Sequence, residues 1–148
     1  MFKNLPFILI VLLLLACGLE PDCSLEQPHD EISVNFYAFK DSTVLIQKFF
    51  YVGAVGTDSV FYNSEDSLLS TFQLKLNPTA TQVQYLFLSG ISSDTLTINY
   101  DKKLKWLSEE CGPSYSYENL VLAYSTFNAL LTSEIIDVQI DENIKIYN

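Results

Sequence analysis

Carboxylates are the side chains in this sequence that hydrolytic acid–base chemistry would use. Acidic residues stand next to one another at four places, which are Asp30-Glu31, Glu65-Asp66, Glu109-Glu110 and Asp141-Glu142. A glycosidase needs two carboxylates that face one bond from opposite sides. Neighbours on a strand point to opposite faces of the sheet, so no adjacent pair meets this requirement alone. The pairs are therefore expected to be solvated turn residues, and the alternative is a hydrolase site assembled from distant strands.

The histidine His29 lies between Pro28 and Asp30, in a stretch without periodic pattern. A histidine can shuttle protons near neutral pH, but the sequence shows no nucleophile–base constellation around it. It also has no glycine-rich phosphate loop, Gly-x-Ser-x-Gly elbow, paired-histidine zinc motif or calcium loop. We expect an exposed spacer residue at His29, no catalytic residue, no metal site and no cofactor.

Cys17 ends the segment "MFKNLPFILIVLLLLAC", in which one lysine precedes an apolar run and a small residue precedes the cysteine. This order is typical of a secretory signal peptide. The run is short for a membrane span, which needs about 20 apolar residues. A buried N-terminal helix is the alternative interpretation.

Leu14-Leu15-Ala16-Cys17 resembles the lipobox of bacterial lipoproteins. The resemblance implies that residues 1–16 are a signal peptide and that Cys17 carries diacylglycerol, with further acylation (palmitate, for example) of the new N-terminus. Two or three acyl chains hold a protein on a bilayer durably, at about 0.8 kcal/mol per buried methylene. The expected location is the bacterial cell envelope, with the outer membrane favoured, and periplasmic and surface-facing placements both stay open.

Cys23 and Cys111 remain once Cys17 is assigned to lipid. Thiols outside the cytoplasm are usually paired, and the remaining number is even. We therefore predict a disulfide bond between Cys23 and Cys111. The alternatives are two free thiols, or a reactive thiol for which His29 would be the available imidazole base.

The charge of the chain bears on its partners. The 148 residues suit one domain, and the formal net charge is -10. All eight basic residues are lysines. A negative field repels phosphate backbones, and the lack of arginine removes the usual bidentate clamp for phosphate. We therefore expect no nucleic-acid partner.

Alternation of apolar and polar residues dominates from Ile32 onward. Residues 17–31 read as a lipidated N-terminus and acidic linker, and residues 32–148 as a single β domain. The runs that predict strands are "ISVNFYAF", "STVLIQKFFYVGAVG", "STFQLKL", "TQVQYLFL", "DTLTINYD", "IIDVQI" and "IKIY". Turn-forming residues separate them, so we expect an all-β fold, an antiparallel β-sandwich or barrel. In residues 118–131, "ENLVLAYSTFNALL", the apolar spacing also allows one short helix.

The candidate binding site lies around Cys111. Trp106, Tyr115 and Tyr117 bracket this cysteine, and exposed rings there could stack on a glycan or anchor a protein partner. They would equally serve as core residues of a β-sandwich. In "DKKLKW", Lys103 and Lys105 share one strand face, which predicts either an ordinary solvated face or a local positive site for an acidic ligand.

Several motifs together resemble one family. They are "DC" soon after the lipid cysteine, "ISVNFY", "LKLNPTATQVQYLFL", "DTLTINYDKKLKWLSEECGPSYSYENL" and "IKIY". They resemble small uncharacterised lipoproteins of Bacteroidetes-type bacteria, classed as a domain of unknown function. The Cys-Gly of that pattern falls on Cys111-Gly112, with Pro113 in the place of an aromatic residue. The resemblance implies a location in the cell envelope and no established activity, so we expect a membrane-anchored, non-enzymatic binding or structural module.

Overall fold

The computed structural model describes residues 23, 29–62, 68–136 and 139–148. The expected signal peptide and Cys17 lie outside the described residues. Among those described, no helix is both long enough and apolar enough to span a bilayer.

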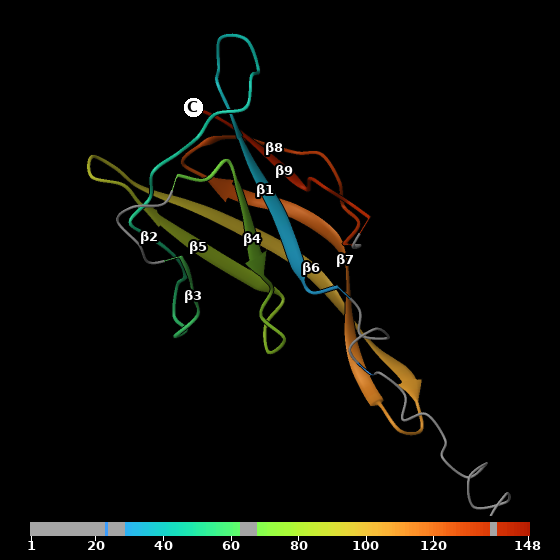
Figure 1. Ribbon diagram of the computed structural model, residues 1–148. Coiled ribbons are helices and arrows are strands. Elements are labelled where there is room, and N and C mark those ends of the chain that lie inside the picture. The colour runs from blue at the N-terminus through green and yellow to red at the C-terminus, as the bar shows by residue number, and fades with distance from the viewer. Residues whose placement is uncertain (1–22, 24–28, 63–67, 137–138) are drawn as a thin grey trace, which may run out of the picture.

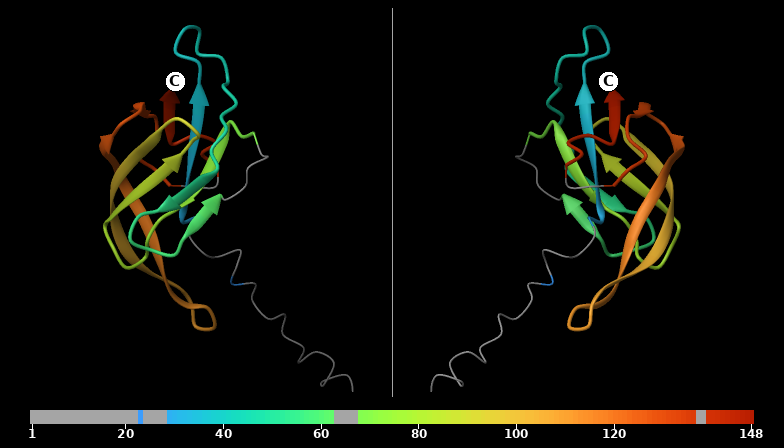
Figure 2. Two further views of the ribbon diagram at one scale, coloured as in Figure 1. Left: turned by 90° about the vertical axis from the view of Figure 1, so that its left-hand side faces the viewer. Right: turned by 90° about the vertical axis from the view of Figure 1, so that its right-hand side faces the viewer.

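Two β-sheets make up the described part of the chain. One sheet has the strand order β4-β1-β9-β8 and the other β3-β2-β5-β6-β7, and neighbours are antiparallel except for the parallel pair β1 and β9. The sheets pack face to face (Figures 1 and 2), so the predicted antiparallel sandwich is confirmed. The strands are β1 (Glu31–Tyr37), β2 (Tyr51–Ala54), β3 (Val60–Tyr62), β4 (Thr71–Lys75), β5 (Gln82–Leu88), β6 (Ser93–Ser108), β7 (Gly112–Ser125), β8 (Asn128–Leu131) and β9 (Ile144–Tyr147).

Aromatic rings fill the space between the sheets. Successive side chains alternate between the two faces of a strand, so one face of β1 and one of β5 supply buried residues throughout. Five phenylalanines meet there with ring centroids 5.3–6.4 Å apart, mostly edge to face: Phe36, Phe49, Phe72, Phe87 and Phe127. Edge-to-face rings add about 0.5–1.5 kcal/mol per pair beyond their area burial.

Residues 118–125 form the second half of β7, and residues 128–131 form β8. The alternative of a short helix over residues 118–131 is therefore wrong. Along this segment the register of β7 against β6 shifts twice, between Thr97 and Ile98 and between Asn99 and Asp101. Each bulge adds a residue to β7 and moves its alternation out of phase. Before and after each bulge, the inward apolar residues fall on different alternate positions. Their spacing along the sequence then resembles that of the apolar face of a helix.

The pattern of residues 135–140, "IIDVQI", predicts a strand. The part that the structure describes is irregular around Ile135 and Ile136, and residues 137–138 lie outside the description. Ile136 packs against the core while Ile135 is exposed. Ile136 therefore contributes to the core from a segment that is not a strand where the structure describes it.

The paired ends of β6 and β7 project beyond the rest of the sandwich as a long hairpin (Figure 1). The projecting part, residues 101–118, is called the hairpin below. It begins at a β7 bulge where Asn119 has φ 53° and its side-chain amide donates to the Asp101 carboxylate at 2.8 Å. Asparagine tolerates this left-handed conformation better than most residues, which allows the chain to change direction there.

Candidate functional site

The tip of the hairpin is joined to the N-terminal segment by a disulfide bond. Cys23 and Cys111 are bonded, with 5.4 Å between their α-carbons, as predicted. Cys111 lies in the turn, where its backbone N–H donates to Ser108 Oγ at 3.0 Å. Gly112 follows with φ 70°, a conformation that a side chain would strain. The bond therefore fixes the segment before β1 to the far end of β6.

The hairpin exposes an apolar face. Leu104 pairs with Tyr115 and Trp106 with Pro113, so these four side chains share one face of the two-stranded ribbon. Alternation along β6 makes this the same face that is buried at Ile98 in the body of the sandwich. Leu104 is 68% exposed and Trp106 65%, and Tyr115 is also exposed. The facing sheet, β4-β1-β9-β8, ends before it reaches the projecting part of the hairpin (Figure 1).

Tyr117 lies on the same strand face but is buried, which corrects the expectation that its ring is exposed. Its side chain is 7% exposed, and its ring lies 5.7 Å from that of Tyr100 at the base of the hairpin. Burial, and then the nearby Asp30 carboxylate, raises the pKa of Tyr117. Tyr117 is therefore a core residue, because it is still covered at the point where the hairpin leaves the body.

The lysines of the hairpin are partly engaged. Lys103 pairs with the Glu118 carboxylate, whose hydrogen bond raises the pKa of the Lys103 ammonium. Lys102 donates to the backbone carbonyl of Pro78 at 2.9 Å, and its nitrogen lies 5.3 Å from the centre of the Tyr115 ring. Lys105 is exposed on the same face as Lys103. Glu118 thus balances part of the positive site that the sequence predicted.

A cavity of about 910 Å³ lies at the opposite end of β6. Its apolar lining includes the partly exposed Phe50 and Leu68, the fully exposed Ile91, and the buried Phe49 from the aromatic core. Its polar lining includes Lys48 and three groups around the start of β6 and β8: Asp94, Thr126 and Asn128. Asp94 is already used, since it accepts from Thr126 Oγ1 at 2.9 Å.

Sequence reasoning missed this cavity. Its walls come from five separate segments, and the pattern treated each as an ordinary strand end or turn. One signal was present: "SGISSD" places Ile91 in the middle of a polar turn, where an apolar side chain has no core to enter. An apolar residue at a turn tip is a reason to look for a binding surface.

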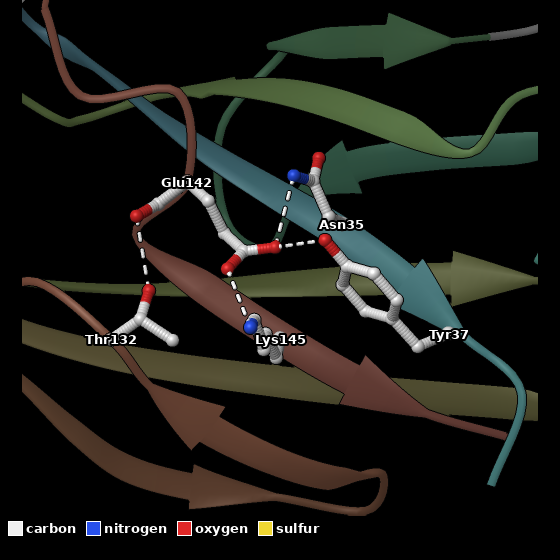
Figure 3. Close-up of polar contacts among 5 residues, drawn as sticks. All are labelled: Asn35, Tyr37, Thr132, Glu142 and Lys145. Atoms are coloured by element: carbon white, nitrogen blue, oxygen red, sulfur yellow. Dashed lines mark hydrogen bonds and ion pairs between the residues drawn. The ribbon is translucent and has the colours of Figure 1, made fainter. Parts of the chain in front are cut away.

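A third polar site surrounds Glu142 (Figure 3). Its carboxylate accepts from the Tyr37 hydroxyl at 2.5 Å and from Asn35 Nδ2 at 3.1 Å, and it lies 3.4 Å from Lys145 Nζ. The Glu142 backbone carbonyl accepts from Thr132 Oγ1 at 3.0 Å. The hydrogen bond to Glu142 is the main cause that raises the pKa of Tyr37, and likewise that of Lys145.

The Glu142 site joins strands and corrects one expectation. Its side chain is 17% exposed, so Glu142 is not a solvated turn residue. The adjacent Asn143 is buried, accepts from the Ser33 N–H at 2.9 Å, and donates to the Ile135 carbonyl at 2.8 Å. These contacts tie the segment before β9 to β1, which is a structural role.

In the two cavities lined by described residues, carboxylates do not meet in pairs. Asp94 is the one acidic residue that lines the larger cavity, and Asp101 the one that lines a smaller cavity of about 510 Å³. In the part of the chain that the structure describes, no three His, Cys, Asp or Glu side chains are grouped as metal ligands would be. His29 is half-buried rather than fully exposed.

The comparisons with known proteins identify the family. The chain belongs to the family described as "Family of unknown function (DUF6452)", whose model matches residues 49–148. This confirms an uncharacterised domain, in agreement with the resemblance seen in the motifs. Neither the curated proteins nor the solved structures gave a significant match.

Proposed function

We propose that this protein is a lipoprotein of a Bacteroidetes-type cell envelope and that its sandwich is a non-catalytic binding module. The order of residues 1–17 supports the signal peptide and the acylated Cys17. The disulfide between Cys23 and Cys111 supports export, because such bonds persist in oxidising compartments.

The observation that carries the proposal is that the Cys23–Cys111 disulfide and the larger cavity lie at opposite ends of one strand, β6. β6 begins beside the larger cavity, which Asp94 lines, and ends at Ser108, next to the turn that holds Cys111. A strand of its 16 residues extends up to about 50 Å. An anchor at Cys17 therefore restrains the hairpin end and leaves the cavity end facing away from the bilayer.

The cavity has the properties of a small-molecule site. Its volume of about 910 Å³ is in the range of ligand pockets, roughly 300–1,000 Å³. Apolar side chains from Phe49, Phe50 and Leu68 could cover an apolar ligand body. The Lys48 ammonium could attract an acidic group, since it is the cationic side chain of the lining. The proposed ligand is therefore a small amphipathic molecule that carries a negative charge.

A carboxylate-based hydrolase has weaker support. Each cavity contributes one acidic residue, and Asp94 already accepts a hydrogen bond from Thr126. The Glu142 carboxylate is engaged by Tyr37, Asn35 and Lys145. These carboxylates do not form a pair in which one could act as general acid and the other as nucleophile on the same substrate bond.

Anilinonaphthalene sulfonate, an aromatic anion, tests the cavity directly. Leu68→Gln should weaken its binding about tenfold, because the probe loses contact with one leucine side chain. Lys48→Gln should weaken it and remove most of its dependence on salt. Leu104→Gln, a change in an equally exposed leucine on the hairpin, is the matched control. Equal loss in the Leu68 and Leu104 variants would show that the probe reports any apolar surface and would refute the site.

The anchor is tested in cells. The protein should partition into the detergent phase, and Cys17→Ser should release it or leave the signal uncut. Mass spectrometry of the membrane-bound protein should find an acylated residue 17 at the N-terminus. A mature N-terminus at another residue would refute the lipoprotein proposal.

A further inference from the structure

The exposed apolar face of the hairpin has a chemistry that fits one particular surface. We propose that Leu104, Trp106 and Tyr115 contact the bilayer that holds Cys17, at the boundary between headgroups and acyl chains. This inference rests on the lipid anchor of the proposed function. It adds a second contact with the membrane, made by the folded domain itself.

The covalent path from the lipid to the hairpin is short. Six residue steps separate Cys17 from Cys23, which span at most about 20 Å when fully extended. The disulfide then adds 5.4 Å between the α-carbons of Cys23 and Cys111. Trp106 is paired with Pro113, two positions after Cys111. The apolar face is therefore held within reach of the membrane surface at all times.

The side chains on this face suit an interface. Tryptophan and tyrosine are enriched where a bilayer meets water, because each has an apolar ring and a polar group. Leu104 supplies apolar area between Trp106 and the body of the sandwich. Lys102 lies on the same face, where its ammonium nitrogen is 5.3 Å from the centre of the Tyr115 ring and donates to the Pro78 carbonyl, so this face carries a positive charge beside its rings.

Charge does not oppose contact between the hairpin and the membrane. Residues 101–118 contain three lysines and four acidic residues, a net charge of -1 (+3 - 4). The charge per residue is similar to that of the whole chain, so the apolar side chains and the tether carry the inference, and repulsion from phosphate headgroups is small. The two adjacent acids at its tip, Glu109 and Glu110, stay solvated in the turn.

The chain offers its own probe, because Trp106 is its one tryptophan. The full mature lipoprotein is reconstituted into vesicles of phosphatidylcholine and phosphatidylethanolamine, and flotation confirms the anchoring. Trp106 emission should lie at shorter wavelength in vesicles than in the Cys17→Ser protein without vesicles. Lipids brominated near the headgroup end of their chains should quench it strongly.

Two leucines provide the matched comparison. Leu104→Asn should reverse the wavelength shift and lower the quenching, while Leu130→Asn, in an exposed leucine of β8, should change neither. A protein that floats while its Trp106 stays unquenched would overturn the inference and leave the anchor intact. A protein that fails to float after correct processing would refute the anchor, and the inference with it.

The same measurement distinguishes other occupants of this face. Trp106 emission that is already at short wavelength without vesicles, and unchanged by them, would mean that the chain itself or a second copy covers the face. That result would also overturn the inference. Dilution would then separate the two cases, since contact with a second copy weakens at low concentration.

Discussion

The two ends of β6 present the same strand face in different surroundings. At the cavity end, loops from several segments stand opposite the strand and leave a hollow between them. At the hairpin end, the facing sheet has ended, and Leu104 and Trp106 stay exposed. In the middle, Leu96 and Ile98 are fully buried. An apolar residue on this face of β6 is buried where the facing sheet β4-β1-β9-β8 covers it and exposed where that sheet has ended.

The ends also differ in how they are held. The disulfide at Cys111 restrains the hairpin covalently, whereas the cavity is bordered by side chains that pack on the aromatic core. A covalent restraint far from the core suits a tether, because it holds the segment without needing buried area. Packing on a rigid core suits a binding site, because it keeps the walls in place.

The largest contrast is expected between a core ring and a hairpin ring. Phe36→Ala should lower the free energy of unfolding by about 3–5 kcal/mol, since a fully buried ring leaves a cavity. Trp106→Ala should change it by no more than about 0.5 kcal/mol, as for other exposed positions. Urea denaturation followed by circular dichroism measures both. A large loss in the Trp106 variant would mean that the hairpin face is part of the core.

Removal of the disulfide should have the next largest effect. For a loop of 88 residues the chain-entropy model gives about 4–5 kcal/mol. Seven residues separate Cys23 from the start of β1, so in the folded protein the segment around Cys23 gains freedom when the bond is removed, which offsets part of this. We expect Cys111→Ala to lower the free energy of unfolding by about 2 kcal/mol under oxidising conditions.

The same Cys111→Ala variant should match the parent protein after reduction of both. A loss of the full chain-entropy value would show that the reduced linker gains no freedom in the folded state. No loss at all would show that the bond does not restrain the unfolded chain.

A smaller difference in stability is expected between two carboxylates, Glu142 in the body of the sandwich and Glu118 in the hairpin. Glu142→Gln should lower the free energy of unfolding by about 1 kcal/mol, because hydrogen bonds from Tyr37 and Asn35 weaken at a largely covered site. Glu118→Gln should have no measurable effect, because its pair with Lys103 is exposed to solvent. Equal effects in thermal denaturation would remove this distinction.

The pH dependence follows from the tyrosines of the body. Hydrogen bonding to Glu142 raises the pKa of Tyr37 above its usual 10.0, and burial raises that of Tyr85 well above it. A raised pKa in the folded state gives stability that is complete below pH 10 and is lost as the pH rises through the folded-state value. Unfolding midpoints should therefore fall above pH 10, and Tyr37→Phe should make the fall shallower. An unchanged slope in that variant would contradict the assignment to Tyr37.

The sequence predicted the sandwich because alternation survives wherever two sheets face each other, as at Ile32, Val34 and Phe36. It also predicted the disulfide, since the number of cysteines and their setting limit the choices. It could not predict the hairpin, because Leu104 and Trp106 have the same pattern as core residues and only the end of the other sheet exposes them. It could not predict the cavity, because its walls come from segments far apart in the chain.

The central claim is that the hairpin end faces the membrane and the cavity end faces away from it. Two lipoproteins with one tryptophan each test this most directly: the natural chain with Trp106, and the Trp106→Phe/Ile91→Trp variant, whose tryptophan stands at the exposed rim of the cavity. Both are placed in vesicles that contain brominated lipids, and quenching by lipid is compared with quenching by an aqueous quencher. We predict that lipid quenches Trp106 and spares the tryptophan at position 91, which the aqueous quencher reaches. Lipid quenching at position 91 without quenching at Trp106 would contradict the account.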